Sequence, residues 1–265
     1  MKSDYKLIVS DFDWTLAGAD MMSTPKVTKA VREWQEEGNM FSIATGRQFL
    51  MIKKECERLS VKNPVVVRGG AEIVDPITGS ILLQHVIDKD VVSELLRELK
   101  NGTYKIAIEK DDAIYTDFYF DPRLKDIISY KELEEFVLQD VPKLLVLMPT
   151  LAPETETHTM HEISVKFPQL HITQVKLRAG IGWDITPASA TKHMGVLELI
   201  KILGLEKEQV VGVGDGYNDF PLLEACGLKV AMGNAVDELK EIADIVVPSF
   251  ENDGIAFLIE KLLSK

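Results

Sequence analysis

Short apolar runs alternate with helical stretches along the first 80 residues of the chain. The apolar runs at residues 7–10, 40–44 and 65–67 predict three buried strands. Between the first two runs, Pro25 suits the first turn of a helix whose apolar residues recur on one face. Strands that alternate with helices are typical of right-handed crossovers, so this part of the chain predicts a parallel sheet.

The last third of the chain repeats this alternation. The pattern predicts strands at 210–213, 229–232 and 245–247 and helices at 191–203, 220–226, from 236, and at 254–263. The middle differs, because its predicted strands, such as 103–109 and 171–177, are longer and alternate between apolar and polar residues. Helices at 88–100 and 153–166 separate them, which is typical of an α+β layer with an antiparallel sheet.

Together these patterns predict an α/β protein with one discontinuous core and one inserted domain. We expect residues 1–80 and 184–265 to form a Rossmann-like α/β core around a parallel sheet. We expect residues 81–183 to form a second, α+β domain that is inserted into this core. The sequence contains no internal repeat that would suggest a different organisation.

The formal net charge of the chain is −12 at pH 7, and 46% of its residues are hydrophobic. No apolar run approaches the ~20 residues that span a bilayer, and the N-terminus lacks the features of a signal peptide. We therefore expect a cytoplasmic protein without a membrane partner. An acidic chain is poorly suited to a nucleic-acid backbone, so no nucleic-acid partner is expected. It also repels phosphorylated ligands, so a phosphate site needs a metal, a lysine or backbone N–H groups.

Polar residues follow the predicted core strands at the points where these strands end. They are Asp11 and Asp13 after the first strand, Thr45-Gly46-Arg47 after the second, and Asp215-Gly216-Tyr217-Asn218-Asp219 after the strand at 210–213. Lys192 opens a predicted helix in the same part of the chain. Because ligands of open parallel sheets bind at the carboxyl ends of the strands, we expect these residues to form one site.

Carboxylates that are packed together repel one another, and burial strengthens this repulsion. A divalent cation between them resolves it, and we predict Asp11 and Asp215 as its carboxylate ligands. Magnesium (Mg2+) prefers oxygen ligands and commonly uses one or two carboxylates together with a substrate phosphate. No cysteine or histidine stands beside these residues, which argues against zinc.

The same residues suggest how a phosphate ester would be cleaved, a reaction that enzymes accelerate by up to ~10²¹-fold. Asp11, at a strand end, is placed to act as a nucleophile and form an aspartyl-phosphate. Asp13 is a second carboxylic acid, which can protonate the leaving oxygen and later activate water. The hydroxyl of Thr45 and the ammonium of Lys192 can hold the phosphoryl oxygens.

The sequence resembles a known family at four places, which are DFDWTL, ATGR, Lys192 and GDGYND. These match, in order, the four signatures of the haloacid dehalogenase (HAD) superfamily of phosphatases. The run GDGYNDFPLLEACGLKVAMGNAVDELKEIAD resembles the Cof-type subfamily, whose large cap lies between the second and third signatures. The resemblance covers nearly all of the expected core, and the inserted domain matches in size and position only.

The resemblance implies a Mg2+-dependent phosphatase of a small phosphorylated substrate, such as a sugar phosphate, a nucleotide or a phosphorylated cofactor. Asp11 and Asp13 would be the catalytic residues, and the metal ligands would be Asp11, Asp215 and the backbone carbonyl of Asp13. Asp219 would orient the water shell of the metal. The phosphate and substrate contacts would come from Thr45, Gly46, Arg47, Lys192 and Asn218. The inserted domain would be the cap that selects the substrate.

Three departures from the family pattern stand out. Lys192 is followed by His193 where glycine is usual, which leaves the role of the lysine unchanged. Trp14 stands where many members have glycine, and Arg68-Gly69-Gly70 stands where the subfamily often has Asn-Gly, so the contacts of that loop stay open. Two other functions also stay open: a phosphomutase that uses the same Asp11 and Asp13, and a phosphate-binding module without catalysis. We expect a monomer or a small homo-oligomer, and the sequence does not identify the substrate.

Overall fold

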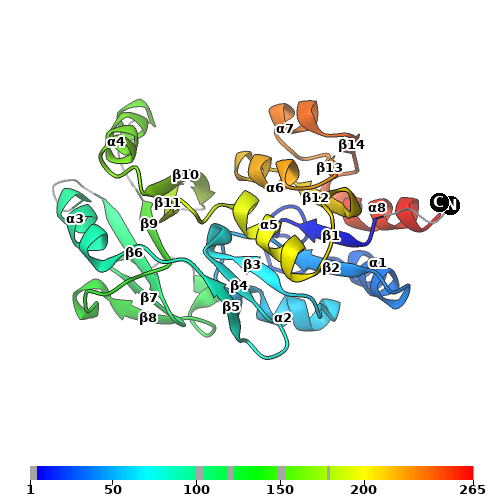
Figure 1. Ribbon diagram of the computed structural model, residues 1–265, viewed down its shortest axis with the longest axis horizontal. Coiled ribbons are helices and arrows are strands. Elements are labelled where there is room, and N and C mark those ends of the chain that lie inside the picture. The colour runs from blue at the N-terminus through cyan, green and yellow to red at the C-terminus, as the bar shows by residue number, and fades with distance from the viewer. Residues whose placement is uncertain (1–4, 100–103, 119–121, 148–152, 178–179, 265) are drawn as a thin grey trace. The chain divides into compact units, whose positions relative to one another are not determined.

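The computed structural model describes the chain except for residues 1–4, 100–103, 119–121, 148–152, 178–179 and 265. The chain divides into two compact units, one formed by Met1–Leu83 with Lys192–Lys265 and the other by Gln84–Thr191 (Figure 1). The boundaries expected from the sequence were after residue 80 and before residue 184, whereas these units change after Leu83 and before Lys192. A strand at Ile81–Gln84 begins directly after the first expected boundary, and a strand at Gly180–Pro187 crosses the second.

The first unit is built on a five-stranded parallel sheet with the strand order β14-β13-β12-β1-β2. The strands are β1 (Leu7–Ser10), β2 (Met40–Ile43), β12 (Val210–Gly214), β13 (Leu228–Ala231) and β14 (Ile245–Val246). Strand β1 lies in the middle and pairs in parallel with β12 on one side and β2 on the other. The carboxyl ends of these three strands therefore lie side by side at one edge of the sheet.

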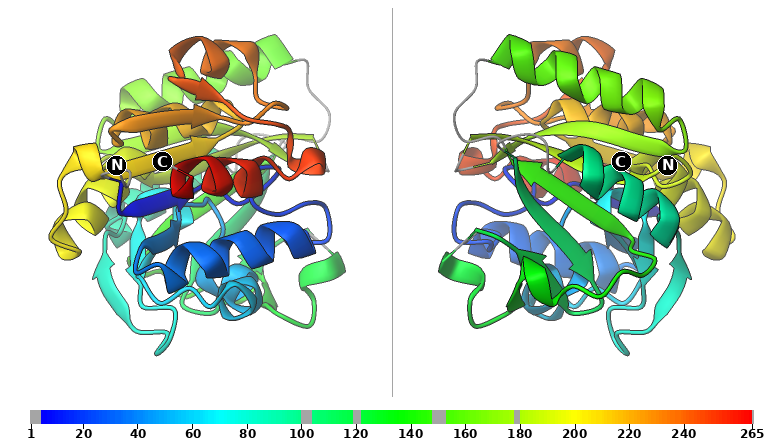
Figure 2. Two further views of the ribbon diagram at one scale, coloured as in Figure 1. Left: turned by 90° about the vertical axis from the view of Figure 1, so that its right-hand side faces the viewer. Right: turned by 90° about the vertical axis from the view of Figure 1, so that its left-hand side faces the viewer.

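Helices cover both faces of this sheet, because alternate residues of its strands are apolar on each side. Ile8 packs into a core with α1 (Pro25–Glu36), α2 (Phe49–Leu59) and α8 (Gly254–Leu263), and Figure 2 shows α1 and α8 along the same side. Leu7 and Val9 pack into a second core on the opposite face. The helices on that face are α5 (Lys192–Ile202), α6 (Phe220–Glu224) and α7 (Asp237–Ile242).

Strand β3 (Val65–Val67) departs from the expected parallel sheet. Among the described residues it pairs with that sheet through one isolated parallel bridge, between Ala44 and Val66, and its regular pairing is with antiparallel β4 (Glu72–Val74). β3, β4 and β5 (Ile81–Gln84) form a separate three-stranded sheet. The chain reverses between β3 and β4 because Arg68, Gly69 and Gly70 all adopt positive φ angles, of 52°, 70° and 107°.

The second unit contains a six-stranded sheet with the order β10-β11-β9-β6-β7-β8. Its strands are β6 (Lys105–Lys110), β7 (Ala113–Thr116), β8 (Ser129–Glu132), β9 (Lys143–Leu147), β10 (Leu170–Leu177) and β11 (Gly180–Pro187). All of its described pairs are antiparallel except β7 with β8. Helices α3 (Lys89–Leu99) and α4 (Pro153–Lys166) share a hydrophobic core with one face of this sheet.

A buried ion cluster lies in the same sheet. Lys143 is 4% exposed, and its Nζ lies 2.9 Å from Asp184 Oδ1 and 3.5 Å from Glu109 Oε1. Burial lowers the pKa of Lys143, but the two carboxylates more than offset this, so the pKa lies above the usual value of lysine. The cluster therefore stays charged and joins the neighbouring strands β6, β9 and β11. Within the described part of the chain, no helix has the length and apolar character needed to cross a membrane.

Candidate functional site

The carboxyl ends of β1 and β12 bring two of the predicted aspartates together. The two strands lie in register, with Ser10 opposite Val213, and the N–H of Asp11 donates to the Val213 carbonyl at 2.8 Å. Asp215 follows directly after Gly214, the last residue of β12. The parallel pairing thus brings residues that lie far apart in sequence to the same edge of the sheet. Thr15 and Asp215, for example, are 200 positions apart and are joined by a hydrogen bond.

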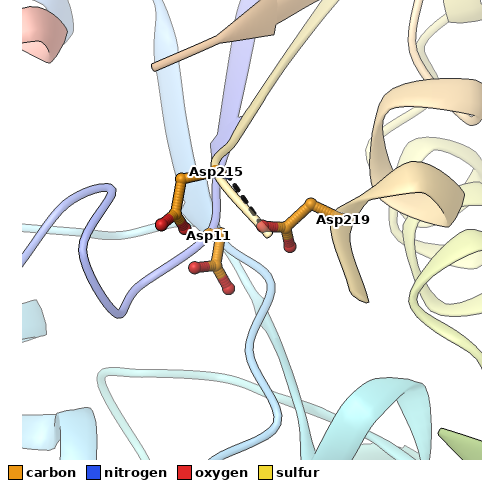
Figure 3. A group of neighbouring side chains, drawn as sticks. All are labelled: Asp11, Asp215 and Asp219. Carbon is orange, nitrogen blue, oxygen red and sulfur yellow. Dashed lines mark hydrogen bonds between the residues drawn. The ribbon is translucent and has the colours of Figure 1, made fainter. Parts of the chain in front are cut away.

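The carboxylates of Asp11, Asp215 and Asp219 point toward one another (Figure 3). Each offers an oxygen atom, and the three atoms lie within 4.8 Å of one another. Asp219 is completely buried, and Asp11 is 4% exposed. Burial raises the pKa of Asp11 well above its usual value, and Asp219 adds to this effect. Burial, followed by the charge of Asp219, also raises the pKa of Asp215 to about 7.

One cation of the chain itself lies in this cluster. Lys192, the first residue of α5, donates from Nζ to Asp11 Oδ1 at 2.5 Å and to Asp219 Oδ1 at 2.6 Å. Burial lowers the pKa of Lys192, but Asp11 and Asp219 more than offset this, so the pKa lies above the usual value of lysine. The ammonium group therefore stays protonated. One positive charge does not balance three carboxylates, so an excess of negative charge remains beside Asp215.

Asp219 is held by the backbone as well as by Lys192. Its Oδ2 accepts hydrogen bonds from the N–H groups of Asp215 and Gly216, both at 3.0 Å. A Cβ atom on residue 214 would lie 2.5 Å from the Cβ of Asp219, so only glycine leaves room for this side chain. Asp219 therefore fixes the turn that carries Asp215 and also orients Lys192.

Asp215 has neutral hydrogen-bond partners at both carboxylate oxygens. The hydroxyl of Thr15 donates to Oδ1 at 3.0 Å, and Nδ2 of Asn234 donates to Oδ2 at 3.2 Å. Neither partner carries a role predicted from the sequence. Thr15 stands inside the DFDWTL signature, which was a usable signal, whereas Asn234 is marked only by its place in the resembling C-terminal run.

Asp13 lies apart from the three-carboxylate cluster and is paired with Arg47. The guanidinium donates from Nε to Asp13 Oδ2 and from Nη2 to Asp13 Oδ1, each at 2.7 Å. The Asp13 side chain is 41% exposed and that of Arg47 is 18% exposed. The predicted acid and the arginine that was expected to face the substrate therefore bind each other in this structure, in the two-point geometry typical of arginine and a carboxylate.

The second strand end carries Thr45, which is 1% exposed. The N–H of Thr45 donates to the Val66 carbonyl at 2.9 Å, and its Oγ1 accepts from the N–H of Arg47 at 3.2 Å. Gly46, which is half-buried, completes this tight turn. Asn218 is half-buried in the short 3-10 helix η5 (Tyr217–Asp219), and among the described residues no hydrogen bond joins it to the acidic cluster.

The Arg68-Gly69-Gly70 turn is hydrogen-bonded to the turn formed by Thr45, Gly46 and Arg47. The N–H of Arg68 donates to the Arg47 carbonyl at 2.8 Å, and the N–H of Gly69 donates to the Thr45 carbonyl at 2.9 Å. The Arg68 side chain points into the core, where it donates to Glu72 Oε1 at 2.7 Å and to Gln48 Oε1 at 3.0 Å. Arg68 is 2% exposed, so this departure from the family pattern is part of the core.

The donor set suits a divalent cation that prefers oxygen ligands. The three clustered side chains are all carboxylates, without histidine or cysteine among them. Burial is the main cause of the raised pKa values of Asp11 and Asp215, and the neighbouring charge of Asp219 adds to it. Among the described residues, the side chains that donate to the Asp215 oxygens are both neutral, so its charge remains available to an ion. This chemistry fits Mg2+ better than a softer metal.

The comparisons with known proteins identify the family of the chain. The family model of the haloacid dehalogenase-like hydrolases matches residues 8–259, and the chain belongs to this family. The phosphoglycolate phosphatase of Methanopyrus kandleri is 26% identical over 262 residues, which cover 98% of this chain and 97% of that protein. The 5-amino-6-(5-phospho-D-ribitylamino)uracil phosphatase YitU of Bacillus subtilis is 24% identical over 277 residues and matches along the full length of both chains.

Solved structures share the fold. A haloacid dehalogenase-like hydrolase from Bacteroides thetaiotaomicron has a TM-score of 0.83 at 23% identity, covering 97% of this chain and 99% of that one. A HAD/COF-like hydrolase from Plasmodium vivax has a TM-score of 0.81 at 26% identity, and the match covers 98% of this chain and 96% of that one. The predicted α/β fold class, the Cof-type HAD resemblance and the class of phosphoric monoester hydrolase are thus confirmed. The roles of individual residues and the metal stay predictions.

Proposed function

We propose that this chain is a Mg2+-dependent phosphatase that hydrolyses a small phosphorylated metabolite through an aspartyl-phosphate on Asp11. The observation that carries this proposal is the position of Lys192, which contacts both Asp11 and Asp219 beside Asp215. Phosphoryl transfer through an aspartyl-phosphate requires a carboxylate as nucleophile, a positive group such as an ammonium for the phosphoryl oxygens, and further carboxylates that hold a cation. The names of the relatives support the substrate class, since phosphoglycolate and a phosphoribitylamino-uracil are both small phosphate monoesters.

In the proposed first step, a carboxylate oxygen of Asp11 attacks phosphorus. The bond between phosphorus and the leaving oxygen breaks, and Asp13 gives that oxygen a proton. In the second step, water attacks the aspartyl-phosphate and gives a proton to Asp13, the bond to Asp11 breaks, and inorganic phosphate leaves. Lys192 holds one oxygen of Asp11 throughout, which supports a fixed direction for the attacking oxygen.

Asp11, Asp215 and the Asp13 carbonyl would hold Mg2+, with Asp219 beside them. When bound, the ion supplies positive charge that stabilises the negative phosphoryl oxygens. Thr45 and Lys192, together with Gly46 and Asn218, would bind those oxygens directly. The carboxylate repulsion described above supports a cation at this point, because without one Asp215, whose pKa is raised to about 7, would be partly protonated at neutral pH.

The ion pair of Arg47 with Asp13 adds a condition to this mechanism. Both carboxylate oxygens of Asp13 accept from the guanidinium, so Asp13 exchanges a proton with the leaving group only after at least one of these bonds opens. A bound phosphate ester supplies competing anionic oxygens for Arg47. We therefore expect Arg47 to turn from Asp13 toward the substrate when a phosphate ester binds.

The unit Gln84–Thr191 is proposed as the cap that selects the leaving group, such as a sugar, a nucleoside or a cofactor fragment. A cytoplasmic location, the lack of a nucleic-acid partner, and a monomer or small homo-oligomer also stay predictions. Screening the purified protein with Mg2+ against a panel of phosphorylated metabolites would identify the substrate class. Release of inorganic phosphate distinguishes the phosphatase from a mutase, which would leave the phosphate on a product sugar.

The decisive test replaces Asp11 by asparagine, which keeps the shape of the side chain and removes its nucleophilic charge. We expect Asp11→Asn to lower phosphate release from an aryl phosphate by ~10⁴-fold or more, as loss of a nucleophile does in other enzymes. Asp20→Asn is the matched control, because Asp20 is exposed in the same segment and caps only the Met22 N–H. Full activity of Asp11→Asn would remove the aspartyl-phosphate mechanism.

A further inference from the structure

Asn234 joins three segments of the first unit through its side chain. Its Nδ2 donates to the Trp14 carbonyl at 2.9 Å and to Asp215 Oδ2 at 3.2 Å. Its Oδ1 accepts from the N–H of Phe250 at 2.9 Å. Both donor hydrogens and the acceptor of this one amide are therefore used, although the residue is exposed.

The bonds to Trp14 and Phe250 fix the amide itself. Trp14 has a φ of 61°, which is uncommon for a bulky residue, and its ring packs edge to face on Phe250 at 6.5 Å between centroids. The N–H of Trp14 donates to the Ala17 carbonyl at 2.8 Å, so this turn is closed on itself. With two of its three bonds made to backbone groups, the Asn234 amide has one orientation from which to meet Asp215.

We propose that Asn234 is a positioning residue that orients the Asp215 carboxylate for a divalent cation. This inference rests on the metal site of the proposed function. Thr15 holds one oxygen of Asp215 and Asn234 holds the other, so the plane of the carboxylate is set from both sides. Both donors are neutral, so they orient the group without cancelling its charge, unlike the ammonium of Lys192 at Asp11. Each oxygen keeps a lone pair for a cation.

The test measures binding of Mn2+, an oxygen-preferring probe, to the purified protein after its metal has been removed. We expect Asn234→Ala to weaken Mn2+ binding by ~10-fold or more, since partners behind metal ligands typically contribute 10- to 100-fold. Asn234→Leu keeps the approximate side-chain volume and should weaken binding as much, because hydrogen bonds and not volume are lost. The backbone bond from the Val236 N–H to the Asp215 carbonyl remains in both variants.

Asn252→Ala is the matched control for these variants. Asn252 lies near the same loop and donates from Nδ2 to Ser249 Oγ at 2.9 Å, without a bond to Asp215. We expect its Mn2+ affinity to equal that of the wild type. The activity that Asn234→Ala loses at low metal concentration should return as Mn2+ is raised, which a general loss of folding would not allow.

The outcomes separate this inference from the proposed function. If the wild-type protein binds Mn2+ in a saturable way and both Asn234 variants bind it equally well, Asn234 does not position the ligand, and the metal site stands. If the wild-type protein binds no Mn2+, the metal site of the proposed function fails first. An activity loss in Asn234→Ala that persists at saturating Mn2+ would also overturn the positioning role.

Discussion

At the scale of single residues, Asp215 carries the most informative electrostatic signature. Its pKa is raised from 3.8 to about 7 by burial and by Asp219, whereas the hydrogen bond from Thr15 acts in the opposite direction. In the unfolded chain the same group titrates near its usual value. Between about pH 4 and about pH 7 the folded, metal-free protein therefore binds more protons than the unfolded chain at this position.

This difference has a definite sign. The raised pKa of Asp215 contributes stability that is present below its unfolded value and is lost as the pH rises toward about 7. Asp11, whose pKa is also raised, acts in the same direction. A cation binds the deprotonated carboxylates, so protons compete with it below about pH 7.

We therefore predict that stabilisation by Mg2+ depends on pH. The increase in the melting temperature on adding Mg2+ should be small near pH 5, grow as the pH rises through about 7, and level off above it. Thermal unfolding with and without Mg2+ across this range measures the effect. Asp215→Asn should remove most of the Mg2+ response at every pH. An equal response of the wild type at both ends of the range would contradict the carboxylate site.

At the scale of elements, the turn between β3 and β4 carries a buried ion pair. The Arg68 and Glu72 side chains are each 3% exposed, and Nη1 lies 2.7 Å from Oε1. Removing one partner of such a pair leaves a buried charge without compensation, which typically costs 3–5 kcal/mol. Replacing both partners by apolar groups usually costs much less, because neither charge is left alone.

Arg68→Met should accordingly lower the free energy of unfolding by about 3 kcal/mol or more. The double variant Arg68→Met with Glu72→Met should recover much of this loss, although Gln48 would still lack the bond from Arg68. Urea unfolding of the single and double variants measures both effects. If the losses of Arg68→Met and Glu72→Met simply added in the double variant, the pair would not act as a unit.

Features that depend on local sequence pattern and on sheet geometry could be predicted from the sequence. Asp11 and Asp215 stand at the ends of apolar strands, and parallel pairing places such ends at one edge, so local pattern and sheet geometry sufficed to expect them together. Lys192 was expected at the site as a group that holds phosphoryl oxygens. Its contact with Asp11 was not expected, because a lysine that opens a helix is most often a surface charge.

Other features were beyond the reach of the sequence. The pairing of Arg47 with Asp13 depends on how two turns from different strands meet, and no local pattern encodes it. Strand β3 was expected in the parallel sheet, but the positive φ angles from Arg68 onward reverse the chain and give it an antiparallel partner. Arginine rarely adopts a positive φ angle, so the presence of Arg68 did not predict a turn at this position.

At the scale of the whole molecule, the two units have separate hydrophobic cores. The helices around the parallel sheet pack in two clusters of the first unit, and α3 and α4 pack with β6, β9 and β11 in the second. The clustered carboxylates and Lys192 belong to the first unit. A ligand that binds only the native form of one unit stabilises that unit directly. The other unit shares the gain only if both unfold in one cooperative transition.

Hydrogen exchange with and without Mg2+ distinguishes these two cases. Mg2+ at ~100 times its Kd stabilises the unit that binds it by ~2.7 kcal/mol, which slows exchange through unfolding of that unit by ~100-fold. We expect this slowing in β1 and β12 and little change in β6 and β9, because each unit has a core of its own. Asp215→Asn, which lacks a ligand, should show no slowing in either unit. Equal slowing of β6 and β9 in the wild type would mean that the chain unfolds as one body, and that the second unit depends on the metal site for its stability.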